Sequence, residues 1–218
     1  MPEVIIVNNE DEAGELYAKC VADLIRNKPN AVLGLATGSS PLAAYKQLAK
    51  KVKEEHIDVS QVRGFALDEY IGLPLTHPES YHSTIHRTVV EPLGLNPDAV
   101  HVPGDVLDGA PLEDGDLIRN AGPDYDAAIE AAGGIDVQIL GIGTIMKARH
   151  LVLLAFGAGK AEAIEETCEG GVSAFCPASA LQMHPHATII IDEAAASRLR
   201  HKDYYKYAFE HKPAWQGI

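Results

Sequence analysis

Residues 65–81 read FALDEYIGLPLTHPESY, and the apolar strand that opens this stretch ends at two adjacent carboxylates, Asp68 and Glu69. The glycine and prolines that follow cannot continue a strand or a helix. Ser80 is a good N-cap for the next helix. Because ligands of open parallel α/β sheets bind at the carboxyl ends of the strands, the two carboxylates are candidates for acid–base catalysis. The alternative is that they only cap the next helix or solvate a loop.

Short apolar runs and helical patterns alternate along the whole chain. The predicted strands cover residues 4–7, 31–35, 62–67, 135–140, 151–155 and 188–191, and the predicted helices cover 11–24, 42–52, 80–92, 112–132, 160–169 and 192–199. This alternation indicates right-handed crossovers and an open, mostly parallel, Rossmann-like α/β sheet with helices on both faces. No linker or internal repeat divides residues 1–218, so we expect one domain.

Composition excludes several classes of partner. The chain has 218 residues and a formal net charge of -13, which argues against binding to nucleic acid or to anionic membranes. Three cysteines without a Cys-x-x-Cys pair argue against a disulfide framework. The sequence contains no signal peptide and no apolar run of roughly 18 residues, so we expect a cytoplasmic protein without a membrane partner.

Two junctions between a strand and a helix have residues suited to an anion. Thr37, Gly38, Ser39 and Ser40 precede a predicted helix, where glycine permits close backbone approach and hydroxyls and free N–H groups can donate. The pattern is neither a Walker loop nor a dinucleotide fingerprint. An ordinary turn with a serine cap is the alternative.

Lys160 follows Gly-Ala-Gly at the second junction. A cation opposes the positive end of a helix dipole, and a bound anion would relieve this conflict. A solvated lysine that points away from the helix is the alternative.

Histidines offer only weak metal signals. His82 and His86 have the i, i+4 spacing of two ligands, but the sequence shows no third ligand near them, and His184 and His186 are no stronger. We therefore interpret these histidines as packing or surface residues and predict no metal site. The absence of Gly-x-Ser-x-Gly removes sequence support for a serine hydrolase.

These motifs together resemble the glucosamine-6-phosphate deaminase family, within the glucosamine/galactosamine-6-phosphate isomerase and 6-phosphogluconolactonase superfamily. The specific match is LDEYIGLP at residues 67–74, continued by HPESY at residues 77–81. Residues 34–41, 141–144, 160 and 180–185 follow in the family order. The similarity spans nearly the whole chain.

The resemblance implies ring opening of an aminosugar phosphate, isomerisation of aldose to ketose, and loss of ammonia to give fructose 6-phosphate. Asp68 resembles the family's base at C2, with Glu69 beside it in the catalytic group. No metal or organic cofactor is implied, because the amino group and the open-chain carbonyl already make the C2 proton labile. A homo-oligomer is left open. By the same resemblance the phosphate would be held by Thr37, Gly38, Ser39, Ser40 and Lys160.

The chain departs from the family pattern after Thr144. There the family continues Asp-Gly-His-Ile-Gly-Phe-Asn-Glu-Pro, which supplies its ring-opening histidine and carboxylate partners, whereas this chain continues Ile145-Met-Lys-Ala-Arg. We expect that a family segment is missing between Thr144 and Ile145, and that a chain of only these residues is a poor catalyst. Both flanks stay close to the family pattern, which favours an omission from the sequence over a true deletion.

Two other functions remain as alternatives. A 6-phosphogluconolactonase would share the fold and the phosphate site, but such enzymes lack the Asp-Glu-Tyr-x-Gly-Leu-Pro pattern found at residues 68–74. A non-catalytic sugar-phosphate sensor would fit the missing segment, since related domains serve as effector modules of transcription regulators. The sequence contains no helix-turn-helix extension and no basic patch to support it.

Overall fold

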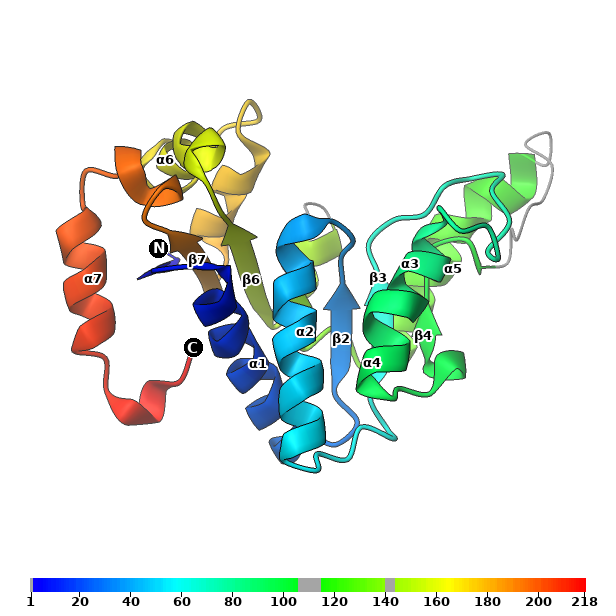
Figure 1. Ribbon diagram of the computed structural model, residues 1–218. Coiled ribbons are helices and arrows are strands. Elements are labelled where there is room, and N and C mark those ends of the chain that lie inside the picture. Colours follow the sequence, from blue (N-terminus) through cyan, green and yellow to red (C-terminus); the bar gives the residue numbers. More distant parts are fainter. Residues whose placement is uncertain (1, 106–114, 140–143) are drawn as a thin grey trace.

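The structure is a computed structural model that describes residues 2–105, 115–139 and 144–218. In this part of the chain seven strands form one sheet, in the order β1-β7-β6-β5-β2-β3-β4 (Figure 1). The strands are β1 (Glu3–Val7), β2 (Val32–Leu35), β3 (Arg63–Ala66), β4 (Val100–His101), β5 (Val137–Ile139), β6 (His150–Ala155) and β7 (Ala187–Asp192). All neighbouring strands pair in parallel, which confirms the predicted sheet.

Helices connect most of these strands. The α-helices are α1 (Glu10–Asn27), α2 (Ser39–Glu54), α3 (Tyr81–Ile85), α4 (Glu91–Leu93), α5 (Gly115–Ala131), α6 (Ala161–Glu169) and α7 (Lys202–Glu210), and a π-helical segment, η1 (His86–Val90), joins α3 to α4. The 3₁₀ segments are η2 (Pro97–Ala99), η4 (Thr144–Lys147), η5 (Ala158–Lys160), η6 (Pro177–Met183), η7 (Ala195–Arg198) and η8 (Ala214–Gln216). Of the helices in the described residues, none is both long enough and apolar enough to cross a membrane.

Two helix starts follow from local sequence. The side chain of Asn9 accepts a hydrogen bond from the N–H of Glu12 at 2.9 Å, and the Glu12 carboxylate accepts one from the N–H of Asn8 at 2.8 Å. This reciprocal cap satisfies N–H groups that have no partner inside α1. Ser80 Oγ accepts from the N–H of Ser83 at 3.0 Å, which confirms the predicted N-cap of α3.

The predicted helix over residues 192–199 is only the short segment η7. Asp192 is the last residue of β7, and its carboxylate accepts hydrogen bonds from the N–H groups of Ala195, at 2.7 Å, and of Gly157, at 3.0 Å. One carboxylate therefore fastens the turn after β6 to the turn after β7. This double role holds Asp192 in the strand, so the helical segment begins later than predicted.

Apolar side chains leave the sheet on both faces. Leu33 and Leu35 pack in one buried cluster with α1, α2 and the segment from α3 to α4, whereas Val32 packs in a second cluster with α5 and α6. Figure 1 shows α1 and α2 together on one face and α5 behind the sheet. This arrangement confirms the predicted helices on both faces.

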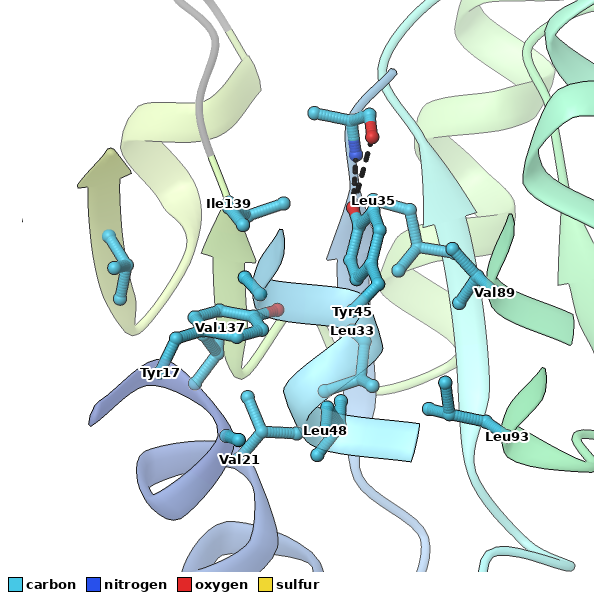
Figure 2. Packing of buried hydrophobic residues seen from close by; sticks show 14 of the residues in the cluster. Tyr17, Val21, Leu33, Leu35, Tyr45, Leu48, Val89, Leu93, Val137 and Ile139 are labelled. Carbon is cyan, nitrogen blue, oxygen red and sulfur yellow. Dashed lines mark hydrogen bonds between the residues drawn. The ribbon is translucent and has the colours of Figure 1, made fainter. Parts of the chain in front are cut away.

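Tyr45 fixes the end of β2 against α2. Its hydroxyl accepts a hydrogen bond from the N–H of Ala36 at 2.9 Å and donates one to the carbonyl of Ala36 at 3.0 Å (Figure 2). Tyr45 and Tyr17 pack edge to face among buried aliphatic side chains such as Leu33 and Leu48. The backbone that leads into Thr37 is therefore held by a buried side chain of the helix that follows it.

The strand order reverses between β2 and β5. From β2 the chain continues to β3 and β4 on one side, and from β5 it continues to β6 and β7 on the other. Gly34 in β2 leaves room here for the Gln138 side chain of β5, because a Cβ on it would lie 1.8 Å from Oε1 of Gln138 and displace that amide. Ligands of open α/β sheets bind outside the carboxyl ends of the strands at such a reversal.

An ion cluster joins strands at the opposite, amino edge. Asp136 is buried and accepts hydrogen bonds from Lys28 at 2.7 Å, from Arg149 at 2.8 Å and from the N–H of Val32 at 2.8 Å. Asp136 itself precedes β5, while Lys28 precedes β2, Val32 begins β2 and Arg149 precedes β6. Removal of the Asp136 carboxylate would leave these donors without their shared partner and would destabilise the fold.

Histidines also gather at the amino edge. His150 is buried, its Nε2 lies 2.9 Å from Oγ1 of Thr188, and the ring of His186 stacks on it with centroids 3.7 Å apart. Burial, and then the neighbouring His186, lowers the pKa of His150 to about 3. His184 is buried as well, with Nε2 2.9 Å from the carbonyl oxygen of Ala148. These rings serve as packing groups.

The three cysteines are free thiols. Cys168 and Cys176 are buried, and Cys20 is partly buried with its Sγ 3.7 Å from Nδ1 of His150. Burial raises the pKa of Cys20 to about 11 and that of Cys168 to about 12. Neither of these two thiols is activated as a nucleophile.

Candidate active site

The turn after β2, residues 37–40, lies at the carboxyl edge beside the reversal in strand order; we call it the β2 turn. Gly38 has φ 117°, a conformation that residues with a Cβ rarely adopt. The helix α2 begins at Ser39 without a side-chain cap and without an acidic residue in its first turn. Its first N–H groups and the hydroxyls of Ser39 and Ser40 can therefore donate to an anion.

Asp68 follows β3, the neighbour of β2 in the sheet. Its side chain is exposed, and no hydrogen bond joins its carboxylate to another residue in the described part of the chain. Partial burial, and then the adjacent charge of Glu69, raises the pKa of Asp68 above its ordinary value. A carboxylate that is free of partners and has a raised pKa is suited to act as a general base.

Glu69 has a different environment from its neighbour. Its Oε1 accepts hydrogen bonds from the N–H groups of Tyr70 at 2.8 Å and Tyr81 at 2.9 Å, and its Oε2 accepts one from the N–H of His82 at 2.7 Å. Glu69 thus caps the start of α3 together with Ser80. Both oxygens are occupied by the backbone, so its geometry suits a positioning group.

Two tyrosines connect Asp68 with the β2 turn. The hydroxyls of Tyr70 and Tyr81 lie 3.2 Å apart, and the Tyr81 hydroxyl also lies close to the side chain of Thr37. The charge of Asp68 acts on the same hydroxyl. Sequence reasoning missed this cluster, although both tyrosines stand in the quoted stretch. Only the fold shows that Thr37 meets Tyr81.

Lys160 lies on the same edge but farther from Asp68. It is exposed and ends η5, directly before α6, at the turn that follows β6. In the sheet β5 separates β6 from β2. Neighbouring strands lie roughly 4.8 Å apart, so β6 and β2 are roughly 10 Å apart. The structure therefore puts Lys160 and Asp68 on opposite sides of the β2 turn.

Other residues named from the sequence fall outside this group. Of the Gly141–Thr144 motif, residues 141–143 lie outside the described part of the chain. The rings of His82 and His86 pack on one another with centroids 4.2 Å apart. Among the described residues no three His, Cys, Asp or Glu side chains are grouped to hold a metal ion.

Sequence comparison identifies the family. The family model of glucosamine-6-phosphate isomerases/6-phosphogluconolactonase matches residues 8–144, more than half of the chain. The chain belongs to this family. A relative in the same family, the glucosamine-6-phosphate deaminase of Bifidobacterium longum (strain DJO10A), is 69% identical over 270 residues, with 100% of both chains covered. The glucosamine-6-phosphate deaminase of Streptomyces coelicolor is 42% identical over 268 residues, with 99% of this chain and 100% of the relative covered.

Solved structures support the same fold for this member of the glucosamine-6-phosphate isomerase/6-phosphogluconolactonase family. A monomeric glucosamine-6-phosphate deaminase superposes with a TM-score of 0.81 at 28% identity and covers 90% of this chain and 99% of its own. The 6-phosphogluconolactonase from Trypanosoma cruzi superposes with a TM-score of 0.73 at 18% identity, covering 92% and 97%. At that identity the likeness concerns the fold alone.

The comparisons also reveal a difference in length from other members of the family. The alignment with the Bifidobacterium longum relative has 270 positions, whereas this chain has 218 residues, so at least 52 positions have no residue here. The match to the family model ends at residue 144.

Proposed function

We propose that this site serves the deamination of glucosamine 6-phosphate to fructose 6-phosphate and ammonia, with Asp68 as the base. The observation that carries the proposal is the Asp68 carboxylate, which has no hydrogen-bond partner in the described chain. Asp68 follows β3, the neighbour of β2 in the sheet, and the start of α2 after β2 is suited to bind an anion. The relatives that align with the whole chain at 69% and 42% identity are glucosamine-6-phosphate deaminases. The substrate would be a small aminosugar phosphate, and the three free thiols are compatible with a cytoplasmic location.

The proposed chemistry needs only proton transfers and water. In the open-chain sugar, Asp68 takes the proton from C2, the electron pair of that C–H bond forms the C1=C2 bond, and the C1=O π pair moves to O1, which takes a proton from water to give an enolamine. Return of a proton to C1, with loss of a proton from the nitrogen to the hydroxide so formed, gives the imine at C2, and water hydrolyses this imine to the ketone and ammonia. A carboxylate with a raised pKa is better matched to this proton transfer than an ordinary one.

The phosphate would bind at the β2 turn, on the N–H groups at the start of α2 and on the hydroxyls of Ser39 and Ser40. Lys160 would supply a positive charge from the far side of β5. In this proposal Glu69 acts as a positioning residue, because its two oxygens hold the backbone that carries Tyr70 and Tyr81.

We further propose that the segment absent from this chain belongs between Thr144 and Ile145. The 52 unfilled alignment positions support a missing segment, and two observations support its position: the end of the family match at residue 144 and the connection from β5 to β6. That connection has only residues 140–149, although parallel crossovers take about a dozen residues or more. The buried Oε1 of Gln138 in β5 also has no hydrogen-bond partner in the described chain.

Ammonia release from glucosamine 6-phosphate tests the function. The 218-residue chain would be compared with a segment-restored chain, in which the unmatched residues of the Bifidobacterium longum relative are inserted between Thr144 and Ile145. We expect ammonia from the segment-restored chain and little from the shorter one. An intact mass of the purified protein would show which of the two occurs naturally.

Two results would contradict the deaminase proposal. The first is no ammonia from either chain, with or without N-acetylglucosamine 6-phosphate as an activator. The second is hydrolysis of 6-phosphogluconolactone without deamination, which would place the lactonase first.

A further inference from the structure

Three hydroxyl groups from two different turns form a connected cluster beside Asp68. The Tyr70 and Tyr81 hydroxyls are 3.2 Å apart, with ring centroids 4.8 Å apart, and the Tyr81 hydroxyl lies close to the side chain of Thr37. The cluster therefore joins the turn that carries the base to the β2 turn. Its members come from the chain after β2 and from the chain after β3.

The backbone holds this cluster in place. A single oxygen, Oε1 of Glu69, accepts the N–H groups of both Tyr70 and Tyr81, so the two tyrosines are fixed relative to one another. Tyr81 also starts a helix whose cap is Ser80. Tyr70 is 53% exposed, and its hydroxyl has further hydrogen-bonding capacity on the solvent side.

A sugar phosphate in this site must span the distance between the two turns. Its phosphate would lie on the β2 turn and its C2 beside Asp68, so the hydroxyls on the carbons between them would face the tyrosine pair. Neutral hydroxyls suit this task because they both donate and accept. The hydrogen bond with Tyr70 is the main cause that raises the pKa of Tyr81, so the Tyr81 hydroxyl stays neutral at physiological pH.

We propose that Tyr81 is a substrate-positioning residue, and that its hydroxyl, within hydrogen-bond distance of the Tyr70 hydroxyl and close to Thr37, recognises the hydroxyl-bearing carbons of the sugar and not its phosphate. This inference rests on the proposed function and deepens it. In this proposal, Tyr81 allows the site to distinguish a sugar phosphate from inorganic phosphate.

Binding by the 218-residue chain tests the proposal directly. Isothermal titration calorimetry would measure the affinity for fructose 6-phosphate and for inorganic phosphate in the wild type and in Tyr81→Phe. The substitution keeps the ring and removes the hydroxyl. We expect it to weaken fructose 6-phosphate binding about 3- to 10-fold, as for one lost hydrogen bond, and to change phosphate affinity less than about 2-fold. Tyr204→Phe, on the exposed side of α7, is the matched control and should change neither affinity.

Two results would overturn the proposal. Equal losses for both ligands would mean that Tyr81 only supports the β2 turn, and unchanged affinities would mean that its hydroxyl does not meet the sugar. If the proposed function itself is wrong, a different result is expected: the segment-restored chain releases no ammonia. A preference for fructose 6-phosphate that Tyr81→Phe removes would support the inference even then. In an active segment-restored chain, Tyr81→Phe should lower kcat/KM about 10-fold.

Discussion

The two edges of the sheet differ in how completely their polar groups are satisfied. At the amino edge Asp136 is buried with three donors, and the His150 and His184 rings are buried with hydrogen-bond partners. At the carboxyl edge Asp68 and Lys160 are exposed, and the start of α2 has no side-chain cap. The amino edge therefore contributes stability, while the carboxyl edge keeps groups available for a ligand. Substitutions at the two edges should separate stability from activity.

The largest effect is expected at the carboxyl edge. Asp68→Asn should lower kcat of the segment-restored chain on the order of 10²- to 10⁴-fold, because an amide cannot accept the C2 proton. Phosphate affinity and the free energy of unfolding should change little. Ammonia release and deuterium exchange at C2 in D₂O would measure the effect. An equal loss of binding and turnover would instead assign a structural role to Asp68.

A large stability effect is expected at the amino edge. Asp136→Asn should lower the free energy of unfolding by about 2 kcal/mol, because the buried carboxylate loses its charged hydrogen bonds with Lys28 and Arg149, which are themselves partly exposed. Asp23→Asn is the matched control: Asp23 pairs with Lys19 and Arg26 at the surface, and its loss should cost less than about 1 kcal/mol. Urea denaturation measures both values. Equal losses would show that the buried Asp136 cluster contributes no more stability than a surface ion pair.

Lys160→Ala should affect ligand binding without affecting stability. Removal of one charge from the phosphate site should weaken binding of phosphorylated ligands about 10-fold, while the melting temperature stays within about 1 °C. Lys202, which pairs with Glu193, offers the control Lys202→Ala, which should leave phosphate affinity unchanged. An unchanged affinity in Lys160→Ala would remove Lys160 from the site.

A smaller, graded effect is expected from pH. The unfolded chain protonates His150 below about pH 6.5, whereas the folded chain does so only near pH 3. The free energy of unfolding should therefore be highest above pH 6.5 and fall by up to about 1.4 kcal/mol per unit as the pH drops toward 5. The lowered pKa values of His186 and His86 act in the same direction.

Urea titrations at pH 7, 6 and 5 would measure this slope. His150→Gln should flatten it, because the amide does not titrate. If the wild type and the variant lose stability in parallel over this range, other groups cause the pH dependence.

Much of this fold could be predicted from local signals. Apolar runs bounded by turn residues gave the strands, and Ser80 gave the start of α3, because both depend on residues close in sequence. The position of Asp68 after a strand could be predicted for the same reason. The candidate site followed once the strands were assumed parallel, since their carboxyl ends then share one edge.

Other features depend on contacts between distant parts of the chain. The sequence shows Asp68 and Glu69 as equivalent neighbours, and only the start of α3 distinguishes them by occupying both oxygens of Glu69. The proximity of Thr37 to Tyr81 depends on β2 lying next to β3. The strand order, and with it the distance of Lys160 from the β2 turn, could not be predicted from any local pattern.

The burial of the thiols has a practical consequence for measuring ligand binding. Cys168 and Cys176 are shielded, and the pKa of Cys20 is raised to about 11, so the natural thiols should react slowly with maleimides near pH 7. An introduced cysteine such as Leu42→Cys, exposed just after the β2 turn and outside the residues assigned to the phosphate, would then take up a fluorophore selectively. Its emission would report arrival of a sugar phosphate in real time, without removal of any natural cysteine.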